Sequence, residues 1–198
     1  VTSTSEPVML PTSRPAIYQL NQANQTVLSW SFTDNTPTNP YLLVIGDSKT
    51  AGHNATTAAG RYVSQLQAAH PDSVVVFSGY GDELTDAVKW LALVRKVRPQ
   101  NVVIALGSND VRNSRTEAAT LENLSRLYEA CKFVGANVYY LAMGENSINQ
   151  SFLWQQAMAM VGSDNMIITY PALAGDGVHL LNTAAHTTVA TAIETKLF

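Results

Sequence analysis

A serine, a histidine and an aspartate in this sequence have the residue types and local settings that acyl transfer requires. Ser48 lies in the segment Gly46-Asp-Ser-Lys-Thr-Ala-Gly52, and His179 follows Asp176 by three residues. Ester hydrolysis through a covalent intermediate needs a nucleophile, a base that takes its proton, and a group that orients the base. We therefore predict Ser48 as nucleophile, His179 as base and Asp176 as the partner that fixes the tautomer of His179.

Hydrogen-bond donors for the developing oxyanion are the fourth requirement, and one such donor is typically worth about 10²–10³ in rate. The backbone N–H of Ser48, the backbone N–H of Gly81 and the side-chain amide of Asn109 are the candidates. Two glycines compete in Ser78-Gly-Tyr-Gly-Asp82. Gly79 stays open as the alternative to Gly81.

Five short apolar runs, each followed by a helical pattern, are expected to position these residues. The runs cover residues 41–45, 73–77, 101–106, 137–141 and 166–170. Continuous apolar character is typical of strands that are covered on both faces in a parallel sheet. The helical patterns between and after them have apolar residues at spacings of three and four. They are marked by Ala59 to Leu66, Leu84 to Val94, Leu121 to Cys131, Trp154 to Val161 and Ala185 to Leu197.

This order predicts an α/β protein, a three-layer α/β/α sandwich with a five-stranded parallel doubly wound sheet. Ligands of such sheets bind outside the carboxyl ends of the strands. Ser48, which we expect to open the first helix, follows the first run, Gly81 the second, Asn109 the third and Asp176 the fifth. All four polar clusters are therefore predicted at one edge of the sheet.

The same clusters resemble the four sequence blocks of the SGNH (GDSL-type) hydrolases, in the family order. Gly46-Asp-Ser48 is similar to the first block, Gly81 to the second, Gly107-Ser-Asn-Asp110 to the third and Asp176-Gly-Val-His179 to the last. The resemblance spans about residues 41–198 and implies a flavodoxin-like fold, the triad of Ser48, Asp176 and His179, and oxyanion donors at Ser48, Gly81 and Asn109. Lys49 departs from the family, which more often has an apolar residue there. We assign Asp47 to bracing the turn.

Composition excludes several other classes of function. The net charge of −3 without a basic run argues against nucleic acid as a partner. No stretch reaches the roughly 18 apolar residues of a membrane helix. The single cysteine, Cys131, cannot form an internal disulfide or assemble a zinc site alone, and its helical spacing favours core packing. We expect no metal and no cofactor.

Residues 1–40 are predicted to be an N-terminal extension, and residues 41–198 the hydrolase domain. Prolines are scattered through the extension, and residues 26–32 alternate like an edge strand that covers the sheet or joins a second subunit in a homo-oligomer. The chain begins at Val1 without a signal-peptide pattern, so we expect a processed or excised form. Only 14% of the residues are charged, which favours an extracellular, cell-envelope or virion-associated location.

The polar loops at residues 111–116 and 144–150 favour an O-acetyl group on a carbohydrate as substrate. Two alternatives of the same fold stay open: a lipase or thioesterase acting on longer acyl chains, and a non-catalytic glycan-binding or assembly module. A phosphate- or flavin-binding protein is disfavoured because G-x-x-x-x-G-K and G-x-G-x-x-G patterns are missing. An α/β-hydrolase is disfavoured because Thr50 interrupts the G-x-S-x-G pattern. We expect His53 to be exposed, and His70 and His186 to have surface or packing roles.

Overall fold

The computed structural model describes residues 17–19, 39–73, 75–79, 84–85, 87–144 and 151–198, and these alternate between strands and helices. The strands are β1 (Ile17–Gln19), β2 (Leu42–Gly46), β3 (Val75–Gly79), β4 (Asn101–Ala105), β5 (Asn137–Met143) and β6 (Met166–Thr169). The α-helices are α1 (Ser48–Ala51), α2 (Tyr62–Ala69), α3 (Ala87–Val97), α4 (Ser108–Arg112), α5 (Glu117–Phe133), α6 (Ser151–Val161) and α7 (Thr183–Leu197). Short 3-10 turns cover Ala58–Gly60 and Ser163–Asn165. All five predicted strands and their helices are confirmed, each close to its expected bounds.

The strands form one parallel sheet in the order β1-β3-β2-β4-β5-β6. The five predicted strands, β2 to β6, have the doubly wound order, in which the direction of winding reverses between β2 and β4. This arrangement confirms the predicted α/β fold. It also places the segments that follow β2 and β4 next to each other at the reversal point, where such sheets bind their ligands.

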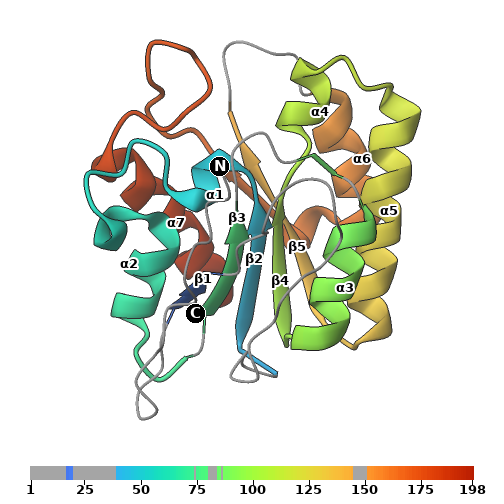
Figure 1. Cartoon of the computed structure of the whole chain (residues 1–198), viewed down its shortest axis with the longest axis horizontal. Coiled ribbons are helices and arrows are strands. Elements are labelled where there is room, and N and C mark those ends of the chain that lie inside the picture. The colour runs from blue at the N-terminus through green and yellow to red at the C-terminus, as the bar shows by residue number, and fades with distance from the viewer. Residues whose placement is uncertain (1–16, 20–38, 74, 80–83, 86, 145–150) are drawn as a thin grey trace, which may run out of the picture.

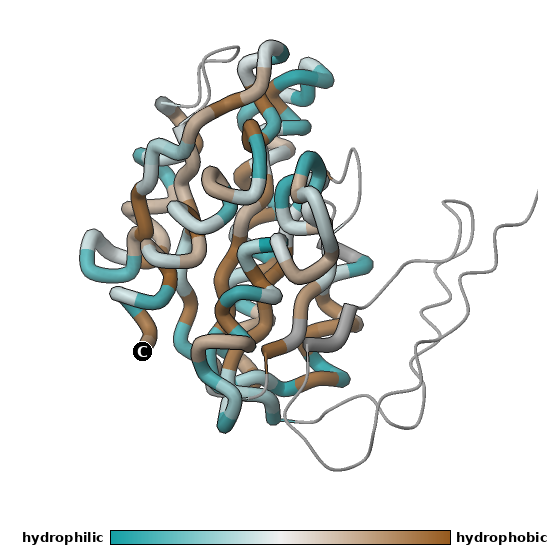
Figure 2. The backbone as a smooth tube through the Cα atoms, turned by 90° about the vertical axis from the view of Figure 1, so that its left-hand side faces the viewer, coloured by the Kyte–Doolittle hydropathy of each residue, from teal (hydrophilic) through white to brown (hydrophobic). Residues whose placement is uncertain are grey.

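Helices cover both faces of the sheet (Figure 1). Alternate residues of the central strand β2 pack in opposite layers. Leu43 and Ile45 of β2 pack in a core with α3, α5 and α6, whereas Leu42 and Val44 pack in a second core with α2 and α7. Figure 2 shows the hydropathy along the backbone, with hydrophobic segments inside and more hydrophilic segments around them. Strands buried on both faces explain why the sequence showed continuous apolar runs.

The predicted helical face around Cys131 is buried within α5. Leu124 and Cys131 are inaccessible to solvent, and burial raises the pKa of the Cys131 thiol to about 12. A thiol with so high a pKa carries almost no thiolate at neutral pH and is a poor nucleophile. The predicted packing role of Cys131 is therefore confirmed.

Residues 17–19, within the predicted N-terminal extension, form β1, which pairs in parallel with β3 of the same chain and becomes the sixth strand of the sheet. The sequence did not predict this strand, because three residues are too short for an alternating pattern to be recognised. The predicted strand at residues 26–32 lies outside the described residues. Among the helices that the structure describes, none combines the length and apolar character needed to cross a membrane.

Candidate active site

The turn that carries Ser48 is tight and fixed at both ends. β2 ends at Gly46, Asp47 is the N-cap of α1, and its carboxylate Oδ1 accepts a hydrogen bond of 3.0 Å from the Lys49 backbone N–H. This bond confirms that Asp47 braces the turn. α1 stops after four residues, because Gly52 adopts a left-handed conformation with φ of 92°. Ser48 therefore opens a single helical turn, and the longer helix predicted after it is the separate α2.

Ser48, His179 and Asp176 form a continuous line of hydrogen bonds. The Ser48 Oγ lies 2.9 Å from His179 Nε2, and His179 Nδ1 lies 2.6 Å from Asp176 Oδ2. Ser48 is half-buried, and it is separated by 131 positions from His179. The sheet thus brings together three side chains that the sequence placed after its first and last strands. These distances are those of a nucleophile, a base and the group that orients the base.

Asp176 is held as an anion by hydrogen bonds. The His179 ring donates to the carboxylate, as do the backbone N–H groups of Val178 at 2.9 Å and His179 at 3.0 Å, and together they hold the pKa of Asp176 well below its ordinary value. An ionised carboxylate only accepts hydrogen bonds, so the proton on the ring lies at Nδ1. In the neutral form of the ring, the lone pair is then on Nε2, which lies 2.9 Å from the Ser48 Oγ.

Asn109 is buried in the first turn of α4, directly after β4. The preceding Gly107 has a φ of 115°, and a β-carbon at that position would lie 3.0 Å from the Leu153 side chain. Only glycine fits this left-handed position without strain. β4 pairs with β2, so the structure brings the Asn109 turn next to the Ser48 turn.

Asp110, the neighbour of Asn109, anchors this turn to the segment after β3. Its buried carboxylate accepts hydrogen bonds from the Thr85 backbone N–H at 2.9 Å and from the Thr85 hydroxyl at 2.6 Å, and Arg115 Nε lies 3.3 Å away. Burial raises the pKa of Asp110, while the bonds from Thr85 and the charge of Arg115 oppose that shift. The turns after β3 and β4 are therefore tied together by one side chain.

Of the two glycines that compete as oxyanion donors, the structure describes only Gly79. Gly81 lies outside the described residues. Gly79 is the last residue of β3, and a β-carbon there would lie 2.7 Å from the Ala51 backbone nitrogen and 2.9 Å from the Asp47 carbonyl oxygen. Gly79 thus has a packing role, which is to let α1 lie close against the end of β3.

Comparison with known families decides where the chain belongs. A sequence model of the GDSL-like lipase/acylhydrolase family matches residues 44–190, which is more than half of the chain and includes every site residue named above. The chain belongs to the GDSL-like lipase/acylhydrolase family. None of the curated proteins matches it.

Solved structures share the fold of this family member at low sequence identity. The esterase EstA from Pseudoalteromonas sp., inhibited by monoethylphosphonate, has a TM-score of 0.63 and 17% identity, over 78% of this chain and 94% of its own. A carbohydrate esterase of family 3 from Talaromyces cellulolyticus has a TM-score of 0.58 and 16% identity, over 79% and 95%. A two-domain esterase active on acetylated mannans has a TM-score of 0.60 and 17% identity, over 81% and 49%.

His53 adds a contact to the Ser48 site that sequence reasoning missed. Its side chain is exposed, as expected, but its ring lies on the His179 ring with centroids 4.0 Å apart. The backbone positions this ring: the His53 N–H donates to the Ser48 carbonyl, and the His53 carbonyl accepts from the buried His186 Nε2. Its closeness to Ser48 in sequence was the available signal.

Lys49, the departure from the family pattern, is buried. Its side chain is 2% accessible, and its ammonium forms an ion pair of 3.1 Å with Asp47. Ser108 completes the group, with its hydroxyl 3.1 Å from Lys49 Nζ and 2.9 Å from Asp47 Oδ2. No pattern in the sequence signalled this cluster, because Lys49 and Ser108 are 59 positions apart.

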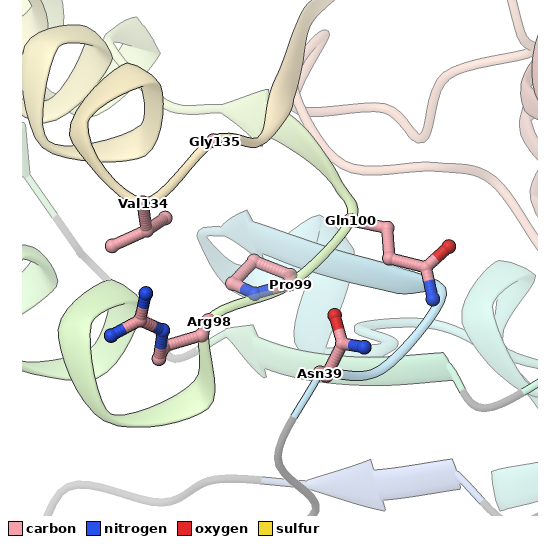
Figure 3. A pocket seen from close by; sticks show the side chains of 6 residues that line it. All are labelled: Asn39, Arg98, Pro99, Gln100, Val134 and Gly135. Atoms are coloured by element: carbon pink, nitrogen blue, oxygen red, sulfur yellow. The ribbon is translucent and has the colours of Figure 1, made fainter.

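A separate hollow of about 460 Å³ lies at the amino ends of the strands, away from the end of the sheet that carries Ser48. Figure 3 shows the residues that line it. Its lining residues precede the strands or connect α3 to β4 and α5 to β5: Asn39, Arg98, Pro99, Gln100, Val134 and Gly135. It is therefore distinct from the Ser48 site. Within the described ranges, no three His, Cys, Asp or Glu side chains gather as they would around a metal ion.

Proposed function

We propose that this acylhydrolase is a serine ester hydrolase with Ser48 as nucleophile, His179 as general base and acid, and Asp176 as the residue that orients His179. The observation that carries the proposal is the line from Ser48 Oγ through the His179 ring to the Asp176 carboxylate, at 2.9 and 2.6 Å. The proposed oxyanion donors are the backbone N–H groups of Ser48 and Gly81 and the side-chain amide of Asn109.

The proposed reaction has two halves. In the first, Ser48 Oγ attacks the ester carbonyl, its proton passes to His179 Nε2, and the alcohol leaves with that proton as the acyl-enzyme forms. In the second, water gives a proton to His179 and attacks the acyl carbon, and the carboxylic acid departs as Ser48 regains its proton. The ionised Asp176 stabilises the imidazolium that forms in each half.

We further propose that the substrate is a short acyl ester, with an O-acetyl group on a carbohydrate as the favoured class. The rim beside Asn109 supports a polar alcohol portion, because Arg112, Asn113 and Ser114 are all exposed there. Two solved structures of similar fold add support by their names, one a carbohydrate esterase and the other an esterase active on acetylated mannans. An acetylated polysaccharide outside the cell or on its envelope is the proposed setting.

Hydrolysis of nitrophenyl esters of increasing chain length tests the reaction and the acyl group together. We expect the acetyl ester to have the highest kcat/KM, and we expect Ser48→Ala to abolish hydrolysis. Ser125→Ala, at an exposed serine of α5, is the matched control and should keep full activity. A preference for long chains would refute the acetyl assignment and support the lipase or thioesterase alternative.

Release of acetate from acetylated polysaccharides then tests the alcohol portion. We expect the release of acetate from the polysaccharide to have a higher kcat/KM than the hydrolysis of nitrophenyl acetate, because the sugar adds contacts at the polar rim. If the protein hydrolyses nitrophenyl acetate but releases no acetate from polysaccharides, the proposed carbohydrate substrate is wrong, while the proposed esterase activity stands. Saccharide binding without hydrolysis of any ester would instead favour the non-catalytic module.

A further inference from the structure

The side chain of Lys49, the residue after Ser48, is buried in a triangle of polar groups. Its ammonium lies 3.1 Å from Asp47 Oδ2 and 3.1 Å from Ser108 Oγ. Ser108 closes the triangle by donating from its hydroxyl to Asp47 Oδ2 at 2.9 Å. The three residues are 1 to 7% accessible, so these interactions are shielded from water and from dissolved salt.

Core stability alone does not explain a lysine at this position. Removing two charges from water carries a large desolvation penalty, and apolar residues of similar volume often replace a buried ion pair with no loss of stability. The two neighbouring cores, one on each face of the sheet, are built from apolar side chains. An ion pair at this point therefore suggests a requirement for defined geometry rather than for stability.

The triangle joins the two turns that carry the proposed nucleophile and the proposed oxyanion donor. Asp47 is the N-cap of α1 and precedes Ser48, and Ser108 is the first residue of α4 and precedes Asn109. Both turns lie at the same end of the sheet (Figure 1). Lys49 bridges them through its ammonium, which contacts Ser108 of one turn and Asp47 Oδ2 of the other. Its backbone N–H bonds Asp47 Oδ1 and so fixes the same carboxylate within the Ser48 turn.

We propose that Lys49 is a positioning residue, which acts through Asp47 and Ser108 to fix the distance between Ser48 and Asn109. This inference rests on the proposed esterase function. Small displacements of catalytic groups have large effects on rate, and an oxyanion donor acts only when it is aimed at the oxygen of the transition state. Loss of the triangle should therefore weaken the contribution of Asn109 to kcat, with little change in KM.

A double-mutant cycle between Lys49 and Asn109 tests this directly, with nitrophenyl acetate as substrate. Lys49→Met keeps an unbranched side chain that is one atom shorter, and it removes the charged ammonium. We expect it to lower kcat by about 10- to 100-fold in the otherwise unchanged protein, and by less than about 3-fold in the Asn109→Ala background. Lys132→Met, at an exposed lysine of α5, is the matched control and should leave kcat unchanged.

Equal effects of Lys49→Met in the two backgrounds would overturn the inference, since a general loss of structure would lower both alike. A Lys49→Met variant with unchanged kcat would overturn it as well. If Lys49→Met does not fold, Ser108→Ala takes its place in the cycle, because it keeps the ion pair and removes only the bridge to the Asn109 turn. We expect that variant to lose about 3- to 10-fold in kcat, again only when Asn109 is present.

The proposed function and this inference fail in different ways. An unsubstituted protein that hydrolyses no ester, or a Ser48→Ala variant that keeps full activity, contradicts the proposed function itself. Ester hydrolysis that depends on Ser48, together with additive effects of Lys49→Met and Asn109→Ala, leaves the esterase in place and removes only the positioning role of Lys49.

Discussion

The ring of His53 lies on the ring of His179, with centroids 4.0 Å apart and planes inclined by 33°. The two ring nitrogens of His179 bond Ser48 and Asp176, and these bonds restrict movement of the ring in its own plane. The ring can still tilt about the line between these two bonds, toward one of its faces. His53 comes from the segment that follows α1, and its carbonyl is held by His186. The contact therefore supports the orientation of the proposed base from the side.

Replacement of His53 tests the value of this contact. Aromatic pairs contribute about 0.5–1.5 kcal/mol, so we expect His53→Ala to lower kcat/KM for nitrophenyl acetate by about 2- to 10-fold. His53→Phe keeps an aromatic face and should retain activity within about 2-fold. Equal activities of both variants and the unsubstituted protein would show that the stack has no part in orienting His179.

The pH dependence of activity follows from the state of Asp176. Hydrogen bonds from the His179 ring and from the Val178 and His179 backbone hold its pKa well below the ordinary value. The carboxylate therefore stays ionised as the pH falls below neutrality, and its bond to His179 is lost only when the pH passes below that depressed pKa. Asp176 therefore takes up no proton in this range, and we expect kcat/KM to decline in acid with the slope of a single proton. A slope of two protons in the pH–rate profile would mean that Asp176 also titrates there.

Stability in mild acid should depend on His186. Burial lowers the pKa of its imidazole, and the charge of Arg61 acts in the same direction. Because the folded-state pKa lies below the unfolded value of about 6.5, the unfolded chain binds more protons, and the free energy of unfolding falls as the pH drops below that value. His186→Gln keeps a donor for the His53 carbonyl but cannot titrate. Its Tm should therefore fall less between about pH 8 and about pH 5 than the Tm of the unsubstituted protein, and equal falls would contradict this assignment.

The contact between Asp110 and Thr85 should contribute to stability. Thr85→Val removes the 2.6 Å hydroxyl bond, and we expect the free energy of unfolding in urea to fall by about 1–2 kcal/mol. Asp110→Ala leaves both donors of Thr85 unpaired and should lower it by about 2–4 kcal/mol. Thr187→Val, at an exposed position of α7, serves as the control and should stay within about 0.5 kcal/mol. If Thr85→Val is as stable as this control, the hydrogen bond from the Thr85 hydroxyl to Asp110 does not contribute to stability.

Much of the fold followed from periodicity, because strands buried on both faces and amphipathic helices leave opposite patterns in the sequence. The meeting of Ser48, Asp176 and His179 could also be predicted, since parallel strands all end at one edge. The short strand Ile17–Gln19 could not. Its place beside β3 depends on pairing between distant segments, which a three-residue pattern does not reveal.

Lys49 shows the limit of sequence reasoning inside the site. A lysine in a polar loop is ordinarily exposed, and only its contacts with Asp47 and with the distant Ser108 make its burial understandable. The ring contact of His53 was hidden for a similar reason, because it depends on where the loop before α7 returns to the end of β2. Both features arise from tertiary contacts rather than from local pattern.

Covalent labelling of Ser48 by a serine-directed phosphonate tests the central claim most directly. We expect one phosphonyl group per chain, found by mass spectrometry on the peptide that contains Ser48, no label in Ser48→Ala, and strongly slowed labelling in His179→Ala. The control Ser125→Ala should be labelled like the unsubstituted protein. Absence of labelling, or a label that persists in Ser48→Ala, would contradict the assignment of Ser48 as the nucleophile.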